Sequence, residues 1–414
     1  MIEFVVMATH SVQVGDFKIG NEERKIINKI LDSGRISEGE NVRMFEKEWA
    51  EFVGTKYAIS VSSGTAALMC GLTALKYHPD RIAKEGSKIV TTPLTYISTS
   101  SAIVTTGFEP VYVDVDSEMF GITPENIKRH LEGVDDIDNY SLILPVHLLG
   151  YPCDMDEINE MAREYGLLVF EDSAEAEGTI YKGKRTGSLS LLSAYSFYIA
   201  HNIQAGEMGA VTTNDYELAR LIKKIKANGR MCDCQICTRS TIGCPKIKTY
   251  KGKDDFDPRF LHDMIGYNFK SMEFQAGLAR TQLKKAEWII KKRQENVKYL
   301  NEHLIDYSDI LQLPIYSDEV SYLAYPLIIK KPELISRKKL RNGLERDGIE
   351  TRPLFGCIPT QQPAFSHLKK EYEGKLPNAE HLGKNAFYIA CHQYLTQEDL
   401  DYIIKKFREI LKNI

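Results

Sequence analysis

The stretch YAISVSSGTAALMCGLTALKY, residues 57–77, decides the fold because a short apolar strand passes through a tight turn into an Ala- and Leu-rich helix. We expect the strand over residues 57–63 and the helix over 64–77. Ser63 before such a run commonly caps a helix. The same helix start can also bind an anion through free backbone N–H groups, since Gly64 permits close approach. The residues alone leave both interpretations open.

The alternation of apolar strand and helix continues outward from this stretch. Short apolar runs that alternate with helices are typical of a largely parallel sheet with helices on both faces. Such sheets bind ligands at the carboxyl ends of their strands, so we expect the functional site there. The remaining expected helices are 21–33, 40–52, 96–106, 124–132, 154–165 and 215–228, and the remaining expected strands are 87–92, 110–116, 141–147, 167–172 and 210–215.

The 414-residue chain is long enough for a large domain and a smaller companion. We predict an N-terminal segment (residues 1–35) that packs on the small domain, a large domain (36–285) and a small α+β C-terminal domain (286–414). Residues 231–263 are expected to form an irregular, Cys-rich insertion in the large domain. One long helix from about residue 273 is expected to connect the two domains.

Charge and hydropathy patterns exclude several classes of protein. The formal net charge is −4, and no block of Lys and Arg indicates a nucleic-acid surface. No apolar stretch approaches the roughly 20 residues that span a bilayer. The start MIEFVVMATHS lacks the basic and apolar regions of a secretory signal. We therefore expect a cytoplasmic enzyme that binds neither membrane nor nucleic acid.

Two further segments carry residues suited to chemistry. Asp172, in EDSAEAE after the apolar strand LLVF, could pair with a protonated pyridine nitrogen, cap a helix or bind a metal ion. The segment SFYIAHNIQAGEMGA (196–210) runs from strand through a glycine-containing loop to strand. Its His201 could move a proton near neutral pH, or be a structural loop residue.

Four of the eight cysteines form a separate cluster, Cys232, Cys234, Cys237 and Cys244, with the spacing C-x-C-x2-C-x6-C. Four thiolates on one loop suit a tetrahedral metal ion or an iron–sulfur cluster. Disulfides are disfavoured in a cytosolic protein. The spacing by itself leaves zinc, iron–sulfur and unliganded thiols open. The other cysteines are expected to be small core residues: Cys70, Cys153, Cys357 and Cys391.

Taken together and in order, the motifs of this chain resemble those of the DegT/DnrJ/EryC1/StrS sugar-modifying aminotransferases. The resemblance implies an α/β fold of the type I pyridoxal-phosphate (aspartate aminotransferase-like) class, with the cofactor on the large domain. It is carried by GRISEGENVRMFEKEWAEFVGTKYAISVSSGTAAL, PLTYISTSSAI, PVHLLGYPCDMDEI, EDSAEAEG, SFYIAHNIQAGEMGAV, GYNFKSMEFQAGLA, ETRPLF and LTQEDLDYII.

The resemblance assigns expected roles around the cofactor phosphate. Gly64 and Thr65 would bind it through backbone amides, and Ser196 through its hydroxyl. Asn268 resembles a residue that reaches the phosphate of a neighbouring subunit, which implies a homodimer with shared sites.

Three more positions correspond to residues that surround the cofactor ring. Tyr96 would stack on the pyridine, Asp172 would pair with its nitrogen, and Glu175 would lie near its 3-hydroxyl. Arg352 and His147 are weaker candidates for the site, because such residues are often structural.

His201 stands where these aminotransferases carry the lysine that binds the cofactor covalently. The resemblance then narrows to a Lys-to-His subset, the sugar 3-dehydrases. It implies non-covalent pyridoxamine phosphate, whose amine condenses with the C4 ketone of a nucleotide-linked 4-keto-6-deoxyhexose. The histidine removes a proton and the C3 hydroxyl leaves. One alternative is an aminotransferase in which another lysine, such as Lys270, substitutes.

The four-cysteine loop resembles that of the iron–sulfur branch of these dehydrases, with a last gap one residue shorter. It implies a [2Fe–2S] cluster that passes electrons from an NAD(P)H-dependent iron–sulfur flavin reductase or a ferredoxin. The second alternative is an inactive relative with a structural zinc ion. Residues 356–365 resemble a substrate-side segment of the dehydrases but lack its Asn and Arg.

Overall fold

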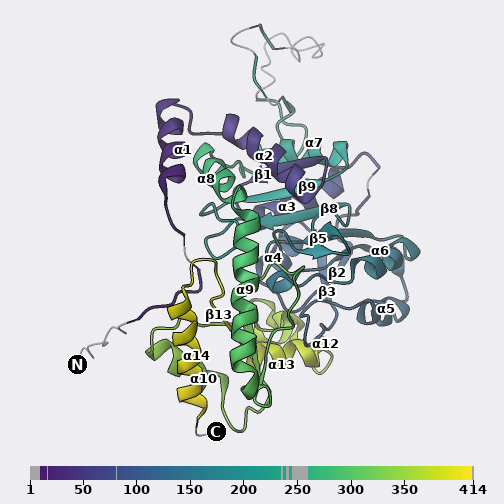
Figure 1. Cartoon of the computed structure of the whole chain (residues 1–414). Coiled ribbons are helices and arrows are strands. Elements are labelled where there is room, and N and C mark those ends of the chain that lie inside the picture. Colours follow the sequence, from purple (N-terminus) through teal and green to yellow (C-terminus); the bar gives the residue numbers. More distant parts are fainter. Residues whose placement is uncertain are drawn as a thin grey trace, which may run out of the picture.

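A seven-stranded sheet forms the centre of the larger part of the molecule (Figure 1). The computed structural model describes residues 10–412 except 16, 81, 235, 239–241 and 245–259. The strand order is β1 (Tyr57–Val61), β9 (Gly209–Thr213), β8 (Leu192–Ser196), β5 (Leu168–Asp172), β4 (Tyr140–Leu144), β2 (Lys88–Thr91) and β3 (Glu109–Tyr112). β9 is antiparallel to both neighbours and the other pairs are parallel, so the predicted mixed, mostly parallel sheet is confirmed.

Helices from the first two-thirds of the chain cover this sheet. α3 packs on β8 and β9, while α1, α2 and α8 pack together at the β1 end (Figure 1). These helices are α1 (Asn21–Asp32), α2 (Glu40–Val53), α3 (Gly64–Tyr77), α4 (Ser98–Thr105), α5 (Pro124–Glu132), α6 (Met155–Glu164), α7 (Tyr216–Ile225) and α8 (Glu273–Leu283). A small hairpin, β6 (Ile180–Tyr181) and β7 (Lys184–Arg185), follows β5.

The C-terminal part has its own antiparallel sheet, reached through the long helix α9 (Ala286–Leu304) in the middle of Figure 1. Its strand order is β10 (Leu311–Gln312), β11 (Tyr325–Ile329), β13 (Ala386–Ile389) and β12 (Arg352–Pro353). Its helices are α10 (Arg337–Arg346), α11 (Ile358–Gln361), α12 (Lys369–Tyr372), α13 (Pro377–Asn385) and α14 (Gln397–Leu411).

The N-terminal residues that are described contact this C-terminal part. Val12 exchanges backbone hydrogen bonds with Gly348 and Glu350, and His10 Nε2 lies 2.7 Å from an Asp399 carboxylate oxygen. We propose that residues 1–35 form an N-terminal segment on the small domain, 36–285 the large domain and 286–414 the small domain.

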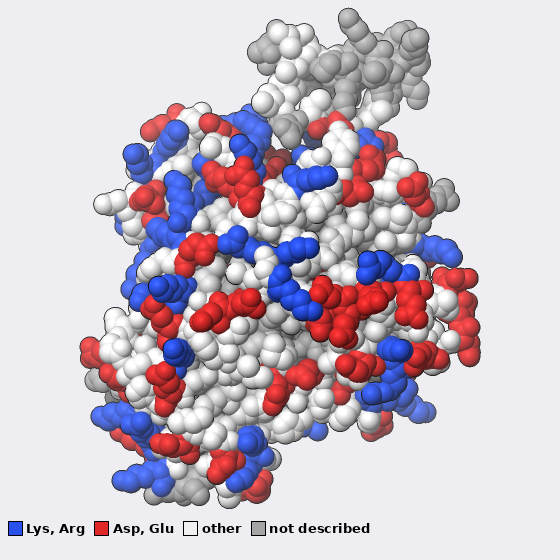
Figure 2. Space-filling model, turned by 45° about the vertical axis from the view of Figure 1, so that its right-hand side comes forward, with Lys and Arg blue, Asp and Glu red and all other residues white. Residues whose placement is uncertain are grey.

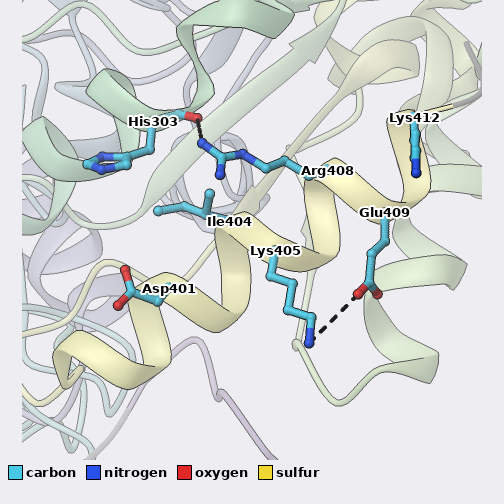
Figure 3. Close-up of a pocket in the computed structure, with 7 residues that line it drawn as sticks. All are labelled: His303, Asp401, Ile404, Lys405, Arg408, Glu409 and Lys412. Carbon is cyan, nitrogen blue, oxygen red and sulfur yellow. Dashed lines mark hydrogen bonds and ion pairs between the residues drawn. The ribbon is translucent and has the colours of Figure 1, made fainter.

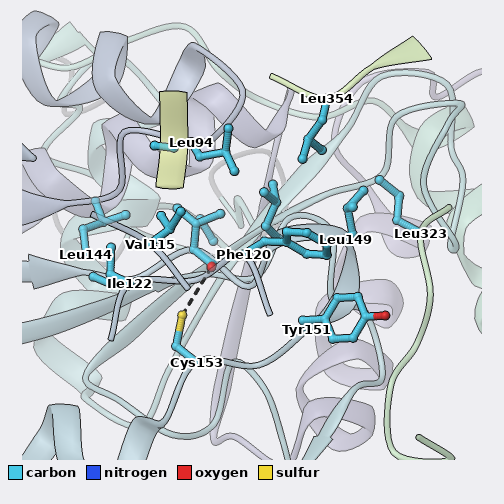
Figure 4. Close-up of a cluster of buried hydrophobic side chains, with 14 of the residues drawn as sticks. Leu94, Val115, Phe120, Ile122, Leu144, Leu149, Tyr151, Cys153, Leu323 and Leu354 are labelled. Atoms are coloured by element: carbon cyan, nitrogen blue, oxygen red, sulfur yellow. Dashed lines mark hydrogen bonds between the residues drawn. The ribbon is translucent and has the colours of Figure 1, made fainter. Parts of the chain in front are cut away.

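One continuous set of buried apolar side chains joins the two sheets. Figure 4 shows part of it, where Leu323 and Leu354 of the C-terminal part lie near Leu94 and Leu149 of the larger part. Close-packed interiors transmit displacements rather than absorb them. The two parts are therefore mechanically coupled through this core.

The N-terminus of α3 is capped by Ser63, whose Oγ accepts the Ala66 N–H at 3.1 Å. Because Ser63 turns the chain into α3, β1 ends at Val61, two residues before its expected end. The N–H of Ser62 instead donates to the Phe269 carbonyl oxygen. The capping interpretation is thus confirmed.

The prediction of one long helix from residue 273 is wrong, because the chain forms two helices there. Helix α8 ends at Leu283, and Lys285 leaves helical geometry at φ −101° and ψ 2° before α9 begins. The side chain of Lys285 is bound to the buried carboxylate of Glu23 at 2.7 Å. A tertiary ion pair thus lies at the break, and no glycine or proline signals the break in the sequence.

Charged side chains of both signs are interspersed over the face shown in Figure 2, as the composition leads one to expect. Among the described residues, no helix combines the length and apolar character needed to cross a membrane.

Candidate active site

A cavity of about 660 Å³ lies at the carboxyl ends of the central strands, where the sequence predicted the site. It is closed on one side by residues of the C-terminal part, including Arg352, Phe355 and Tyr388. Seven of the eight predicted catalytic and cofactor-binding residues line it: Gly64, Thr65, Tyr96, Asp172, Glu175, Ser196 and His201. The segments that supply them are separated by up to 137 positions in the chain, from Gly64 to His201.

The N-terminus of α3 and the end of β8 form one end of the cavity. Gly64 and Thr65 are the first two residues of this 14-residue helix, so their N–H groups have no partner within it. The helix dipole adds partial positive charge there. The Ser196 hydroxyl lies beside Gly64, since a Cβ added at Gly64 would meet Ser196 Cβ at 2.7 Å and Oγ at 3.1 Å. This end is a cradle of the size and chemistry that suit a phosphate.

Gly64→Ala is expected to destabilise the fold by about 1–3 kcal/mol, the usual cost of overpacking, because the new methyl group meets Ser196. It should also weaken phosphate binding at the cradle. Urea unfolding measures the stability change. Gly133→Ala is the matched control, because a Cβ there meets its nearest atoms at an ordinary 3.5 Å and should change stability by less than about 0.5 kcal/mol. Equal effects of the two variants would contradict the prediction.

Asp172 ends β5 and places a buried carboxylate at the base of the cavity. Its Oδ2 accepts a hydrogen bond from Thr99 Oγ1 at 2.9 Å, and its Oδ1 accepts one from the Ala174 N–H at 3.1 Å. Burial raises the pKa of Asp172 above its usual value, although these hydrogen bonds and nearby His147 and His201 oppose the shift. A buried carboxylate of this kind favours a cationic group beside it.

An aromatic side chain with a free surface stands over the same cavity. Tyr96 is 59% exposed although it lines the cavity, and its ring meets Phe355 edge-on at 5.9 Å between ring centroids. An aromatic face left open beside a cavity can stack on a planar ring.

Glu175 and His201 line the part of the cavity behind Asp172. Glu175 Oε2 accepts the Leu149 N–H at 2.8 Å, and burial raises the pKa of this carboxyl to about 7. The His201 side chain is 13% exposed. Its Nδ1 lies 3.0 Å from the Ser196 carbonyl oxygen. Burial lowers the pKa of His201, but Glu177 and then Glu175 outweigh burial and raise it above its usual value.

Two charged residues that were not predicted from the sequence, Glu177 and Arg293, lie near His201 or its partner without lining the cavity. Glu177 lies 3.6 Å from His201 Nδ1 and is fully buried, and the guanidinium of Arg293 on α9 lies near enough to affect its pKa. Glu177 lies two residues after Glu175 in EDSAEAEG, and this spacing of acids could have indicated it. No local pattern indicates Arg293, because it comes from a helix more than a hundred residues away.

Asn268 is the predicted site residue that the structure places elsewhere. Its side chain is exposed, does not line this cavity, and accepts a hydrogen bond from Lys270 Nζ at 3.1 Å. Of the two weaker candidates, Arg352 lines the cavity and pairs with Glu350 at 2.9 Å. His147 does not line the cavity. Its side chain is fully buried, with Nε2 3.0 Å from a Glu171 carboxylate oxygen.

The four clustered cysteines are all described, although residues between and after them lie outside the described parts. Cys234 and Cys237 are exposed, and Cys232 and Cys244 are partly exposed. The other four, Cys70, Cys153, Cys357 and Cys391, are buried, as expected. Within the described residues no three His, Cys, Asp or Glu side chains are placed to hold one metal ion. The donor set is therefore suitable for a cluster, but the thiols as arranged do not converge on one.

A second depression, of about 360 Å³, lies between α9 and α14 (Figure 3). Its charged groups have local partners: Lys405 is 3.9 Å from Glu409, and Arg408 donates to the His303 carbonyl oxygen at 3.4 Å. None of the predicted site residues lines it, so we assign it no chemistry.

The profile of the DegT/DnrJ/EryC1/StrS aminotransferase family matches residues 18–408. The GDP-4-keto-6-deoxy-D-mannose 3-dehydratase of Escherichia coli O55:H7 is 30% identical, over 94% of this chain and 96% of that protein. A solved structure of E. coli GDP-4-keto-6-deoxy-D-mannose-3-dehydratase with bound hydrated PLP superposes with a TM-score of 0.83 at 28% identity, covering 96% of this chain and all of the other. The predicted fold class is thereby confirmed.

An aminotransferase is similar to the same degree. The structure of the aminotransferase from Psychrobacter cryohalolentis superposes with a TM-score of 0.82 at 28% identity, covering 96% of this chain and 98% of the other. Overall similarity therefore shows the fold and the sugar-modifying family but does not separate dehydration from amino transfer.

Proposed function

Because this chain belongs to the DegT/DnrJ/EryC1/StrS aminotransferase family, we propose that it dehydrates a nucleotide-linked 4-keto-6-deoxyhexose at C3 with pyridoxamine phosphate. The observation that carries the proposal is the composition of the cavity. His201 lines it, and none of its described lining residues is a lysine. A transaminase of this family needs such a lysine to bind its cofactor covalently and to shuttle protons.

The cavity fits the cofactor at each of its ends. The cradle of Gly64, Thr65 and Ser196 suits the phosphate, while Asp172 suits a protonated ring nitrogen. Tyr96 has an exposed surface that could cover the ring. Glu175 also lines the cavity, and we propose that it binds the 3-hydroxyl. When bound, the cofactor supplies an amino group for the C4 ketone and an electron-poor ring.

His201 is the proposed base. A carbonyl oxygen can only accept a hydrogen bond, so the contact with Ser196 O requires that Nδ1 carries the proton. In the neutral imidazole Nε2 is then the unprotonated nitrogen, and we propose that it takes the proton within the cavity that His201 lines. An imidazole in this tautomer can remove a proton and later return it to a leaving hydroxyl.

We propose a homodimer with shared sites, in which Asn268 serves the cavity of the second copy. The support is that its exposed side chain lies outside the cavity of its own chain. Sedimentation velocity should then give a dimer, and an Asn268→Ala chain mixed with a His201→Asn chain should regain part of the activity.

The four clustered thiols are proposed to bind a [2Fe–2S] cluster that receives electrons from an NAD(P)H-dependent iron–sulfur flavin reductase or a ferredoxin. This proposal is supported by the accessibility of all four thiols, which are exposed or partly exposed, whereas the other four cysteines are buried. Metal sites commonly assemble only when the metal binds, so the separate thiols do not count against a site. We assign no step of the reaction to the cluster.

The function is tested by anaerobic incubation with pyridoxamine phosphate, a reductant and a panel of nucleotide-linked 4-keto-6-deoxyhexoses, followed by mass spectrometry of the sugar. Loss of one oxygen supports C3 deoxygenation. Gain of an amino group overturns the proposal in favour of an aminotransferase. Lys270, the lysine considered for that alternative, does not line the cavity.

Metal analysis of anaerobically purified protein is expected to give iron and acid-labile sulfide in equal amounts. Zinc without iron would contradict the cluster and favour a structural zinc site in an inactive relative. Replacing Cys237 with serine should remove the iron. Cys153→Ser should retain it, because Cys153 is buried and its Sγ contacts the Val146 carbonyl oxygen.

A further inference from the structure

Glu177 is a carboxylate held out of water beside His201. Its side chain is fully buried, and both of its oxygens lack a hydrogen-bond partner within the described part of the chain. A buried carboxylate without hydrogen bonds costs free energy, and such groups recur where they serve function. Glu177 Oε1 lies 3.6 Å from His201 Nδ1, close enough to interact electrostatically in a dry interior.

Two groups near Glu177 favour its charged form, the imidazole of His201 and the guanidinium of Arg293. Arg293, fully buried on α9, directs Nη1 to the carbonyl oxygens of Tyr322 and Leu323, and its Nη2 has no partner among the described residues. Burial raises the pKa of Glu177 above its usual value, although His201 and, less strongly, the Arg293 guanidinium oppose that shift. The carboxylate therefore interacts with one permanent cation and with one group that can become a cation.

The other titratable groups near this pair come from two more elements. Glu175 lies on the same loop as Glu177, and Asp172 lies at the end of β5, so both are further acids around His201. The phenol of Tyr195 on β8 is also near Glu177, but its hydroxyl donates to the Thr186 carbonyl oxygen. Neither Asp172 nor Glu175 contacts the imidazole in a recorded hydrogen bond, so Glu177 is the acid placed against Nδ1.

We propose that Glu177 is the positioning residue of this site: with the Ser196 carbonyl it fixes the His201 ring so that Nδ1 keeps its proton and Nε2 faces the reaction. The inference rests on the proposed function, in which His201 is the base. When Nε2 takes a proton, the ring keeps both protons and gains one positive charge, which the Glu177 carboxylate balances. In the same way, a buried carboxylate beside Nδ1 holds the tautomer of a catalytic histidine and stabilises its charged form in serine proteases.

The test compares the full-length protein with Glu177→Gln, which removes the charge and keeps the shape, and Glu177→Asp, which keeps the charge. Histidine C2–H exchange, followed by mass spectrometry over a pH series, reports the titration midpoint of each imidazole without cofactor. The His201 midpoint is expected to fall in Glu177→Gln and to stay nearer the parent value in Glu177→Asp. His147, which pairs with Glu171, is the internal reference and should not move.

Turnover gives the second measurement. Glu177→Gln should lower kcat by roughly 10- to 100-fold, the usual effect of removing a group that orients a catalytic residue, with little change in KM. Glu177→Asp should recover part of the loss. If the His201 midpoint and kcat are both unchanged in Glu177→Gln, the inference is overturned. If the midpoint falls but the parent protein dehydrates no sugar, the positioning role stands and the proposed function fails.

Discussion

Replacing His201 with asparagine is expected to lower the rate of sugar dehydration by roughly 10²- to 10⁴-fold, the usual contribution of one positioned acid or base. Asparagine can still donate to the Ser196 carbonyl oxygen, which His201 Nδ1 contacts at 3.0 Å, but it cannot accept a proton near neutral pH. The cradle and Asp172 are untouched, so cofactor affinity should change little. Single-turnover sugar consumption and cofactor titration measure the two effects separately.

A matched control is His262→Asn. His262 also contacts a backbone carbonyl oxygen, that of Asn228 at 2.8 Å, but it is exposed and lies outside the cavity. It should leave the rate unchanged. A His201→Asn enzyme that retains the parent rate would remove His201 from the mechanism.

His201→Lys tests the same position by introducing the lysine that aminotransferases of the family carry there. A lysine at this place in the cavity can bind the cofactor covalently, so borohydride should trap it on that residue and amino transfer should replace dehydration. A lysine variant that traps no cofactor would argue against the placement of His201 beside the ring.

Asp172→Asn is expected to weaken cofactor binding and turnover together by roughly 10²- to 10³-fold. Removing one partner of a buried ion pair costs about 3–5 kcal/mol, and each tenfold change corresponds to about 1.4 kcal/mol. The amide keeps the shape of the side chain and can still accept from Thr99, but it carries no charge to balance a protonated ring nitrogen. Equilibrium dialysis measures the affinity and initial rates measure the turnover.

Thr99→Val is the companion variant for this prediction. It removes the 2.9 Å hydrogen bond to Asp172 and the 3.0 Å hydrogen bond to Thr95, keeps the carboxylate, and should cost about 1–2 kcal/mol, less than loss of the carboxylate. If Asp172→Asn binds the cofactor as tightly as the parent, then Asp172 does not pair with the ring nitrogen.

Most of the cavity could be predicted from the sequence because its residues lie at the ends of elements that are themselves encoded locally. Gly64 and Thr65 begin α3, Asp172 ends β5 and Ser196 ends β8. Once apolar strands alternate with helices, parallel pairing brings such ends to one edge of the sheet. The chemistry expected of His201 came instead from the resemblance to a known family.

The parts that could not be predicted depend on contacts between distant segments. The break between α8 and α9 lies at the pairing of Lys285 with Glu23, which are 262 residues apart. Arg293 comes near Glu177 only because α9 runs along the molecule from the larger part to the C-terminal part (Figure 1). The spacing of the four cysteines suggested convergent ligands, yet the described thiols remain apart.

The sequence by itself thus determined the order of strands and helices and the residues at their ends, because periodicity, capping and glycine geometry act within a few residues. Only the tertiary structure decided that the buried carboxylate of Glu177 lies beside the partly buried His201, that Arg293 is buried near Glu177, and that Asn268 does not line the cavity of its own chain. The physical reason is that burial and electrostatic pairing depend on how distant elements pack, and no local pattern records that packing.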